Sequence, residues 1–225
     1  MLLLITDTSG KRGFVGIVRA TEALPAGVEV ADEVPLAGGT FSAELVPQIA
    51  ALLEKHGLRK ADIEAFVVVS GPGSFTGLRV GLSAIKALAE ILRKPIVPVS
   101  LLEAIALASG SQGRVSALLD AGRGDAYVGE YEVSGEQSRL IREELLPQEE
   151  FFSNAASKVA TPDESLAAKA DDKKSAVVRV VPPGAEAIAR LGWRKLQAGE
   201  TVTPEQLDAN YIRRSVAEIF SKPTP

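Results

Sequence analysis

Short apolar runs open the chain and predict a group of strands before the first helix. Residues 2–6 are almost continuously apolar, which is typical of a strand buried on both faces of a sheet. Residues 13–20 predict a second strand, joined to the first by the turn-forming stretch 7–10, and residues 28–36 predict a third. We therefore expect the first two strands to form a hairpin.

Helices then alternate with strands. Apolar residues recur at helical spacing over 43–56, so we predict a helix there, with Ser42 as its N-cap and Gly57 at its C-terminal end. The elements predicted after it are a buried strand over 65–69, a helix that runs from a glycine-rich turn to about residue 92, a strand over 96–99 and a helix over 100–108.

The second half of the chain partly repeats this order. Its predicted elements are a buried strand over 115–119, an acidic turn over 120–125, a returning strand over 126–133, a polar stretch over 134–150 and a helix over 185–197. A strand, an acidic turn and a strand thus occur twice, near 2–19 and near 115–133, which is a hint of internal duplication. No linker is evident, and we interpret the second half as a shorter copy of the first.

The stretch Ser70-Gly-Pro-Gly-Ser-Phe-Thr-Gly-Leu-Arg79 has the glycines of a phosphate-binding loop without its chemistry. A Walker loop needs a lysine followed by serine or threonine at the helix start, where this chain has Gly77-Leu-Arg79. A dinucleotide-binding turn needs the spacing G-x-G-x-x-G and an acid after the next strand. Here the glycines are spaced differently and the next strand ends at Ser100, so neither cofactor class fits.

A packing role explains these glycines better than an anion site does. Gly77 and Gly81 lie one helical turn apart, with Ala84 and Leu88 on the same face. A glycine inside a helix costs about 1 kcal/mol relative to alanine, so two of them on one stripe indicate the close approach of another backbone. An internal helix or a helix of a partner could make that approach.

Composition and net charge limit the classes of function that this protein can have. The 225 residues suit one large domain or two small ones, and 46% apolar with 24% charged residues is ordinary for a globular protein. A net charge of −4 argues against a chain that binds nucleic acid on its own. Without cysteine, disulfides, thiolate nucleophiles and zinc–thiolate sites are excluded. We expect no signal peptide, no membrane helix and a cytoplasmic location.

Asp7 and Asp120 each follow a buried strand at the start of a hairpin turn. Acids in such places usually cap their turns. The alternative is that both hold a hydrated magnesium ion, as strand-end carboxylates do in actin-like ATPases and sugar kinases. A two-metal nuclease would need more acids near the strands, and Glu44 and Glu103 are more simply interpreted as acids at helix starts.

The other conspicuous side chains are interpreted as structural or solvated. His56, the only histidine, stands at the predicted C-terminal end of a helix, where a cation suits the helix dipole. Trp193 is expected to anchor the last helix, and the cation pairs 194–195 and 213–214 are expected to be solvated.

Several segments spread along nearly the whole chain carry a family resemblance. They are Ile5-Thr-Asp-Thr-Ser9, Phe41-Ser-Ala-Glu-Leu-Val-Pro47, Ser70-Gly-Pro-Gly-Ser-Phe-Thr-Gly-Leu-Arg-Val-Gly81, Pro98-Val-Ser-Leu-Leu-Glu-Ala-Ile105, Asp120-Ala-Gly-Arg-Gly-Asp-Ala-Tyr127 and Asn210-Tyr-Ile-Arg-Arg214. Together they resemble the TsaB (YeaZ) family of bacterial tRNA threonylcarbamoyladenosine biosynthesis proteins. The match is weakest over 134–200.

The resemblance implies an actin-like ATPase (ribonuclease-H-like) fold of two related α/β lobes, here residues 1–110 and 111–225, with the second reduced. It also implies a noncatalytic subunit that binds and activates a TsaD-type transferase, which forms N6-threonylcarbamoyladenosine next to the tRNA anticodon. A TsaE-type ATPase takes part, and tRNA would be touched only indirectly. Family members also self-associate through the first-lobe helices, which correspond to 42–56 and 76–92.

The surface of the helices 42–56 and 76–92, together with the small-residue face of the second helix, is the interface that we expect for a partner protein. Its residues are Ser42, Leu45, Ile49, Gly77, Gly81, Ala84 and Leu88.

The chain also departs from its catalytic relatives, which bind a metal with two histidines on the first-lobe helix. Phe41 and Glu44 stand in that neighbourhood here, so we expect neither a metal site nor a catalytic residue. Asp7, Thr8 and Ser9 are expected to be a vestigial nucleotide-binding turn, with no cofactor beyond weak binding of ATP or ADP. The alternative function is a stand-alone actin-like ATPase or phosphotransferase that uses Asp7 and Asp120 with magnesium.

Overall fold

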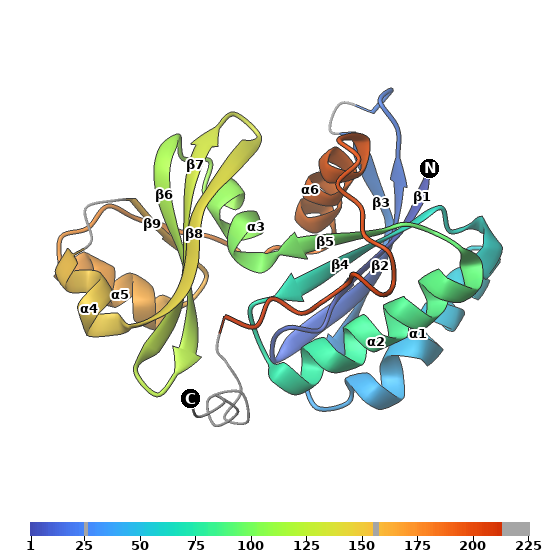
Figure 1. The fold of residues 1–225 in the computed structure, drawn as a ribbon, viewed down its shortest axis with the longest axis horizontal. Helices are drawn as coiled ribbons and strands as arrows, with labels where there is room; N and C mark the ends of the chain where they lie inside the picture. Colours follow the sequence, from blue (N-terminus) through green and yellow to red (C-terminus); the bar gives the residue numbers. More distant parts are fainter. Residues whose placement is uncertain (25–26, 155–157, 213–225) are drawn as a thin grey trace, which may run out of the picture. The chain divides into compact units, whose positions relative to one another are not determined.

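A computed structural model describes residues 1–24, 27–154 and 158–212, and it divides into two compact units (Figure 1). The first unit contains Met1–Ala104 and Val181–Asn210, and the second contains Ile105–Val180. The sequence had placed everything after residue 110 in the second lobe. The difference arises because helix α6 (Ala185–Gln197) packs on strands β1 to β5 of the first unit.

The sheet of the first unit has five strands in the order β3-β2-β1-β4-β5. The strands are β1 (Leu2–Asp7), β2 (Arg12–Ala20), β3 (Val28–Ala37), β4 (Ala65–Gly71) and β5 (Ile96–Ser100). The first three are antiparallel neighbours, and β1, β4 and β5 are parallel neighbours. The central strands β1 and β4 are buried almost throughout, which explains their continuous apolar sequences.

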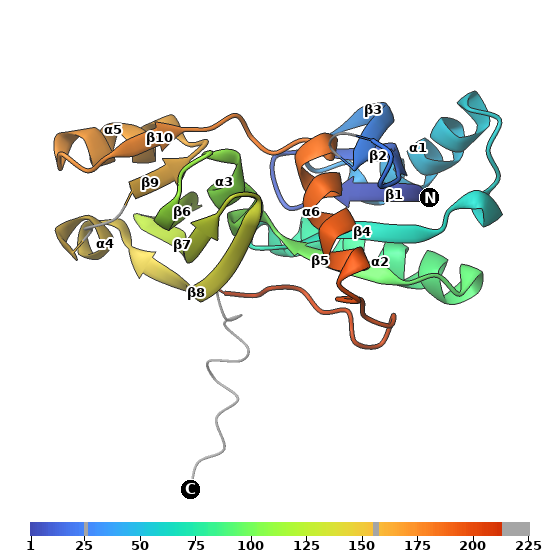
Figure 2. The ribbon, with the colours of Figure 1, turned by 90° about the horizontal axis from the view of Figure 1, so that it is seen from above.

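Helices cover both faces of this sheet (Figure 2). Helices α1 (Phe41–Lys55) and α2 (Phe75–Leu92) contact each other and pack against the face that carries Phe66 and Val68. Helix α6 packs on the opposite face, where Gly192 lies against the side chain of Val67. The alternation along β4 therefore places α1 and α2 on one side and α6 on the other.

The start of α1 differs from the prediction. Thr40 occupies the N-cap position, without a side-chain hydrogen bond to the helix, and Ser42 is the second residue of the helix. The C-terminal end is as expected: Gly57 has φ of +64° and its N–H donates to the carbonyl oxygen of Glu54. A three-residue 3₁₀ turn, Lys60–Asp62, and helix α3 (Leu101–Ala108) complete the elements before the second sheet.

The second unit repeats the strand order of the first. Its sheet runs β10-β9-β6-β7-β8, and its elements are β6 (Gly113–Gly122), β7 (Asp125–Ser134), β8 (Gln137–Pro147), α4 (Gln148–Asn154), β9 (Lys158–Thr161), α5 (Glu164–Asp172) and β10 (Val177–Arg179). In chain order, each sheet places its third, second, first, fourth and fifth strands side by side, with the same parallel and antiparallel pairs.

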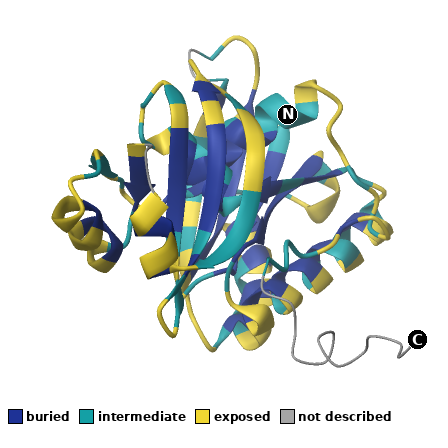
Figure 3. Cartoon of the chain, turned by 60° about the vertical axis from the view of Figure 1, so that its left-hand side comes forward, coloured by how far each residue is buried: buried dark blue, intermediate teal, exposed yellow. Residues whose placement is uncertain are grey.

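The hint of duplication is therefore confirmed, and the sequence missed elements beyond it. The polar stretch 134–150 forms edge strand β8, whose exposed residues hide the apolar alternation of a strand (Figure 3). The short elements β9, α5 and β10 were not predicted either. Within the described residues, no helix is long and apolar enough to span a membrane.

Asp32 on β3 connects the sheet to the C-terminal end of α1. Its Oδ2 accepts a hydrogen bond from Lys55 Nζ at 2.6 Å and lies 2.9 Å from His56 Nε2. The hydrogen bond from Lys55, followed by that from His56, lowers the pKa of Asp32 to about 2. His56 thus has the structural role expected from the sequence.

We predict that this contact is lost in acid. A carboxyl with a lowered pKa in the folded state stabilises the fold fully above its unfolded pKa of about 3.9, and that contribution disappears as the pH falls through about 2. Between about pH 5 and pH 2 the wild type should therefore lose more unfolding free energy than Asp32→Asn does. Urea unfolding at both pH values measures this, with Glu29→Gln on the same strand as control; equal losses in all three proteins would contradict it.

Candidate functional site

Asp7 ends β1 and holds the turn that follows it. One of its carboxylate oxygens, Oδ1, accepts hydrogen bonds from the backbone N–H of Ser9 at 2.7 Å and from its hydroxyl at 2.6 Å. Asp7 and Ser9 are both buried. Burial raises the pKa of the Asp7 carboxyl, and the two hydrogen bonds from Ser9 act in the opposite direction.

Three glycines of α2 and its preceding turn lie directly against this turn. A Cβ atom on Gly73 would come closer than 3.0 Å to the carbonyl oxygen of Ser9, and one on Gly77 equally close to the carbonyl oxygen of Thr8. A Cβ on Gly81 would overlap the Thr8 hydroxyl oxygen. The spacing of four residues places Gly77 and Gly81 on one side of the helix, and Gly73 lies in the turn just before it; no side chain fits at any of the three positions.

Hydrogen bonds hold the same contact. The Thr8 hydroxyl donates to the carbonyl oxygen of Gly77 at 2.8 Å, and the N–H of Ser74 donates to the carbonyl oxygen of Ser9 at 2.6 Å. Ser74 is also the N-cap of α2, since its hydroxyl accepts from the N–H of Gly77. We call this junction of residues 7–9 with Gly73, Gly77 and Gly81 the glycine junction.

The glycine junction corrects part of the expected interface. Gly77 and Gly81 are buried within the first unit, so they cannot offer a bare surface to a partner. Leu45 and Ile49 belong to the hydrophobic core of that unit, at 1% and 4% exposure. The close approach inferred from the glycine spacing is real, but a turn of the same chain makes it.

Phe41 fills the place next to the junction. Its ring is 4% exposed and packs against both Gly13 and Gly77, where a Cβ on either glycine would crowd it. An aromatic ring here extends the apolar core beneath α1 and α2 and supplies no ligand for a metal. Among the described residues, no group of three or more histidine, aspartate or glutamate side chains could hold a metal ion.

The solvent-exposed surface of α1 and α2 includes apolar residues beside charged ones such as Glu54, Lys55 and Glu90. Ser42 is exposed, and Ala84 and Leu88 are half-buried, so these three of the expected interface residues remain accessible. We define the outer α1–α2 face as a set of accessible, uncharged residues of the two helices, of which the half-buried Val80, Ala84 and Leu88 also pack against the core: Ala43, Val46, Pro47, Ala50, Thr76, Val80, Ala84, Ala87, Leu88 and Ile91. Val46 is 54% exposed and Ile91 is 71% exposed, and no member of this set carries a charge.

Asp120 is the counterpart of Asp7 in the second unit. Its Oδ1 accepts from the N–H of Gly122 at 3.0 Å, the same two-residue turn contact that Asp7 makes with Ser9. Gln148 Nε2 also donates to Asp120 Oδ1, at 3.2 Å. Each acid thus caps its own turn, and Asp120 is exposed where Asp7 is buried.

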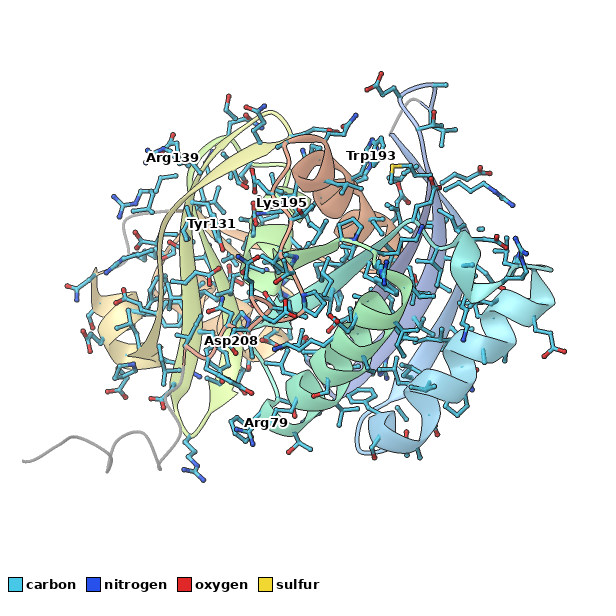
Figure 4. The ribbon with its side chains drawn as sticks, turned by 45° about the vertical axis from the view of Figure 1, so that its right-hand side comes forward. Arg79, Tyr131, Arg139, Trp193, Lys195 and Asp208 are labelled. Atoms are coloured by element: carbon cyan, nitrogen blue, oxygen red, sulfur yellow. The ribbon has the colours of Figure 1, made fainter. Side chains whose placement is uncertain are left out.

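The other sequence candidates lie elsewhere. Glu103 forms an ion pair with Lys195 at 3.1 Å, between α3 and α6 of the first unit. Trp193 packs against Gly27, so it anchors α6 as expected (Figure 4). Glu44 lies in the first turn of α1 without a role in the junction. The pair Arg213-Arg214 lies outside the described residues.

Sequence reasoning missed that Gly73 and residues 8–9 belong to the same contact. The available signal was the repeat of glycine at 73, 77 and 81. This repeat indicates a helix face without side chains, but it does not indicate that the turn at residues 8–9 packs against that face.

We predict that a methyl group inside the glycine junction destabilises the first unit. Gly81→Ala should cost about 1–3 kcal/mol of unfolding free energy, because Thr8 must give up its hydrogen bond to move aside. Gly77→Ala should cost about 3 kcal/mol or more, since the clashing atom is backbone. Ala87→Leu, on the solvent side of the same helix, is the control; urea unfolding compares the three, and similar stability of all three would refute the contact.

A second prediction concerns the buried charge of Asp7. A carboxyl whose pKa is raised by folding destabilises the fold when ionised; this cost is absent below the unfolded pKa of about 3.9 and complete above the folded pKa. Asp7→Asn keeps an oxygen for Ser9 and removes the charge. Its melting temperature should exceed that of wild type at about pH 7.5, by about 2–4 °C per kcal/mol gained, and converge with it toward about pH 4.

The matched control is Asp120→Asn, which makes the same change at the exposed turn of the second unit. Thermal melts at the two pH values measure the effect. A lower melting temperature for Asp7→Asn at the higher pH would show that the ionised carboxylate stabilises the turn.

Comparison with known proteins agrees with this architecture. The family model of TsaD, tRNA N6-adenosine threonylcarbamoyltransferase, matches residues 35–218. The structure of YeaZ from Pseudomonas aeruginosa superposes with a TM-score of 0.73 at 25% identity and covers 93% of this chain and 100% of that one. The expected actin-like ATPase fold is thereby confirmed.

Curated relatives point to the same family. The tRNA threonylcarbamoyladenosine biosynthesis protein TsaB of Escherichia coli is 27% identical over 186 residues, which is 77% of this chain and 80% of the relative. TsaB of Bacillus subtilis is 33% identical over 134 residues, 59% of this chain and 56% of the relative, so the match spans about half of that protein. With a family model that matches most of the chain, these likenesses show that the chain belongs to the TsaD family, in the branch that contains TsaB and YeaZ.

Proposed function

We propose that this chain is a noncatalytic subunit that binds and activates a TsaD-type transferase for N6-threonylcarbamoyladenosine formation in tRNA. The observation that carries the proposal is the outer α1–α2 face, a set of accessible residues that includes the apolar side chains of Val46 at 54% and Ile91 at 71% exposure. Exposed apolar surface of this kind marks sites of protein–protein contact.

The chemistry of this face suits a partner helix. Most residues of this face are small, which allows another helix to approach closely. The larger exposed side chains of Val46 on α1 and Ile91 on α2 can pack against such a helix. Charged residues such as Arg79 and Glu90 are exposed beside it. An apolar centre with a polar rim is the usual arrangement in protein interfaces.

The glycine junction supports the same proposal from another side. The amide and hydroxyl of Ser9 are both occupied by Asp7, and the first turns of α2 cover Thr8. A turn whose donors are already satisfied by its own chain has fewer of them to offer a phosphate. This favours a scaffold role over catalysis.

The alternative function, an actin-like ATPase or phosphotransferase that uses Asp7 and Asp120 with magnesium, has one observation in its favour. Asp7 is a buried carboxylate with a raised pKa, a feature that is common at functional sites. Hydrolysis of ATP by the purified chain, lost in Asp7→Ala, would support the alternative. We expect none above the background of the buffer.

Further partners belong to the same proposal. A TsaE-type ATPase would complete the assembly, and the chain would reach tRNA only through its partners, as its net charge of −4 suggests. A homodimer through the outer α1–α2 face would compete with the transferase, because both would cover one surface. A cytoplasmic location follows from this role.

We predict that a charge on the outer α1–α2 face prevents binding. Val46→Glu and Ile91→Glu should each weaken the affinity for the host's TsaD-type transferase about tenfold or more, because burying an unpaired carboxylate is costly, while the fold survives. Isothermal titration calorimetry with the purified transferase measures the dissociation constant. Formation of the modified nucleoside by the reconstituted components gives a second readout.

The control is Leu140→Glu, an exposed apolar residue of the second unit at 54% exposure. This variant should bind like wild type. Unchanged affinity of both helix variants would remove the outer α1–α2 face as the docking surface, and equal loss in Leu140→Glu would show a general effect of added charge.

A further inference from the structure

A polar cavity of about 560 Å³ is lined by residues of the second unit. It opens between α4 and the sheet strands β6 to β9. Residues that line it and enter the argument are Arg114, Glu130, Arg142, Glu144, Glu150 and Lys158. A volume of this size falls within the range of small-molecule pockets, about 300–1,000 Å³.

Glu130 anchors the floor of the cavity. It is 5% exposed, and its two carboxylate oxygens accept one guanidinium each, from Arg142 Nη2 at 2.8 Å and from Arg114 Nη2. The hydrogen bond from Arg142 lowers the pKa of Glu130, burial opposes it, and the hydrogen bond from Arg114 adds to the lowering. Two arginines from strands on either side of β7 are thus held at fixed positions by one buried carboxylate.

Two cationic groups of the lining, Arg114 and Lys158, keep donors available. Arg114 uses only one terminal nitrogen on Glu130, and its side chain is 56% exposed. Lys158 donates only to the carbonyl oxygen of Gln112, at 3.3 Å, and forms no ion pair with the described residues. Guanidinium groups that are already oriented lose little entropy when they bind a phosphate or carboxylate.

The lining also offers acceptors. Glu144 lies 2.5 Å from Arg142 Nη1, and the carboxylate of Glu150 on α4 makes no hydrogen bond or ion pair within the described residues. Carboxylates accept hydrogen bonds from hydroxyl groups, and they repel a second anionic group. Leu146 and Phe151 add apolar surface to the lining.

We propose that this cavity binds a small phosphorylated polyol, with its phosphate at Arg114 and Lys158 and its hydroxyl groups at Glu144 and Glu150. Inorganic phosphate alone would fill only a small part of the cavity volume. A ligand with several anionic groups would be repelled by the carboxylates of Glu144 and Glu150. A network that served only to join β6, β7 and β8 would need neither the open guanidinium of Arg114 nor the unpaired Glu150. The site is independent of the proposed function of the first unit.

The test is calorimetric titration of the full chain, at constant ionic strength, with ribose 5-phosphate, inorganic phosphate and ribose in separate arms. Ribose 5-phosphate should bind, and more tightly than either of its parts. Arg114→Gln should weaken ribose 5-phosphate and phosphate about tenfold or more. Glu150→Gln should weaken ribose 5-phosphate but leave phosphate unchanged.

Two further variants keep the test decisive. Lys158→Gln removes a phosphate donor without touching the Glu130 network and should weaken binding even if Arg114→Gln fails to fold. Arg139→Gln is the matched control, an exposed arginine on β8 outside the cavity lining (Figure 4), and should bind like wild type.

Three outcomes would overturn the proposal. The first is no binding of ribose 5-phosphate by wild type up to about 10 mM. The second is equal affinity in wild type, Arg114→Gln and Lys158→Gln. The third is equal affinity for ribose 5-phosphate and phosphate, which would remove the role of the carboxylates.

Discussion

The contact between α2 and the turn after β1 is the interaction on which the first unit depends. Gly73, Gly77 and Gly81 place a helix directly on the backbone of residues 8 and 9, with no side chain between them. Because interiors are close-packed and no side chain fits into this contact, the contact restricts the position of α2 on the sheet. Helix α1 packs on α2, so the glycine junction also influences how the residues of the outer α1–α2 face are arranged.

The same contact distinguishes the two copies of the strand–turn–strand element. Asp7 and Asp120 make equivalent bonds to the amide two residues later, yet the first turn is buried under α2, whereas Asp120 stays exposed and is contacted by Gln148 of α4 and by Asp163 at the start of α5. Burial raises the pKa of Asp7, whereas Asp120 remains exposed with Gln148 as an added partner. The duplicated element thus has two environments, and the buried copy connects the turn at Asp7 to the helices that we propose dock a partner.

The second unit differs from the first in that its helices are shorter. Helix α4 has 7 residues where its counterpart α1 has 15, so the second sheet is less fully covered than the first. Apolar packing by Phe151 and Leu166 covers part of that face, and the remainder carries the buried Glu130 with its arginines. A buried carboxylate needs such partners to remain ionised, and the reduced helix layer leaves room beside them for a ligand.

The sequence by itself indicated the succession of strands and helices along the first half, the hairpin of its first two strands, a hint of duplication, the family resemblance and a bare helix face. These features are local, since apolar runs, turn residues and glycine spacing act over a few neighbouring positions. Only the tertiary structure decided what covers the glycines, because Thr8 and Gly77 are 69 residues apart and their pairing leaves no periodic signal. The place of α6 on the first sheet and the arginines around Glu130 were likewise decided by contacts between distant segments, which a pattern of neighbours does not encode.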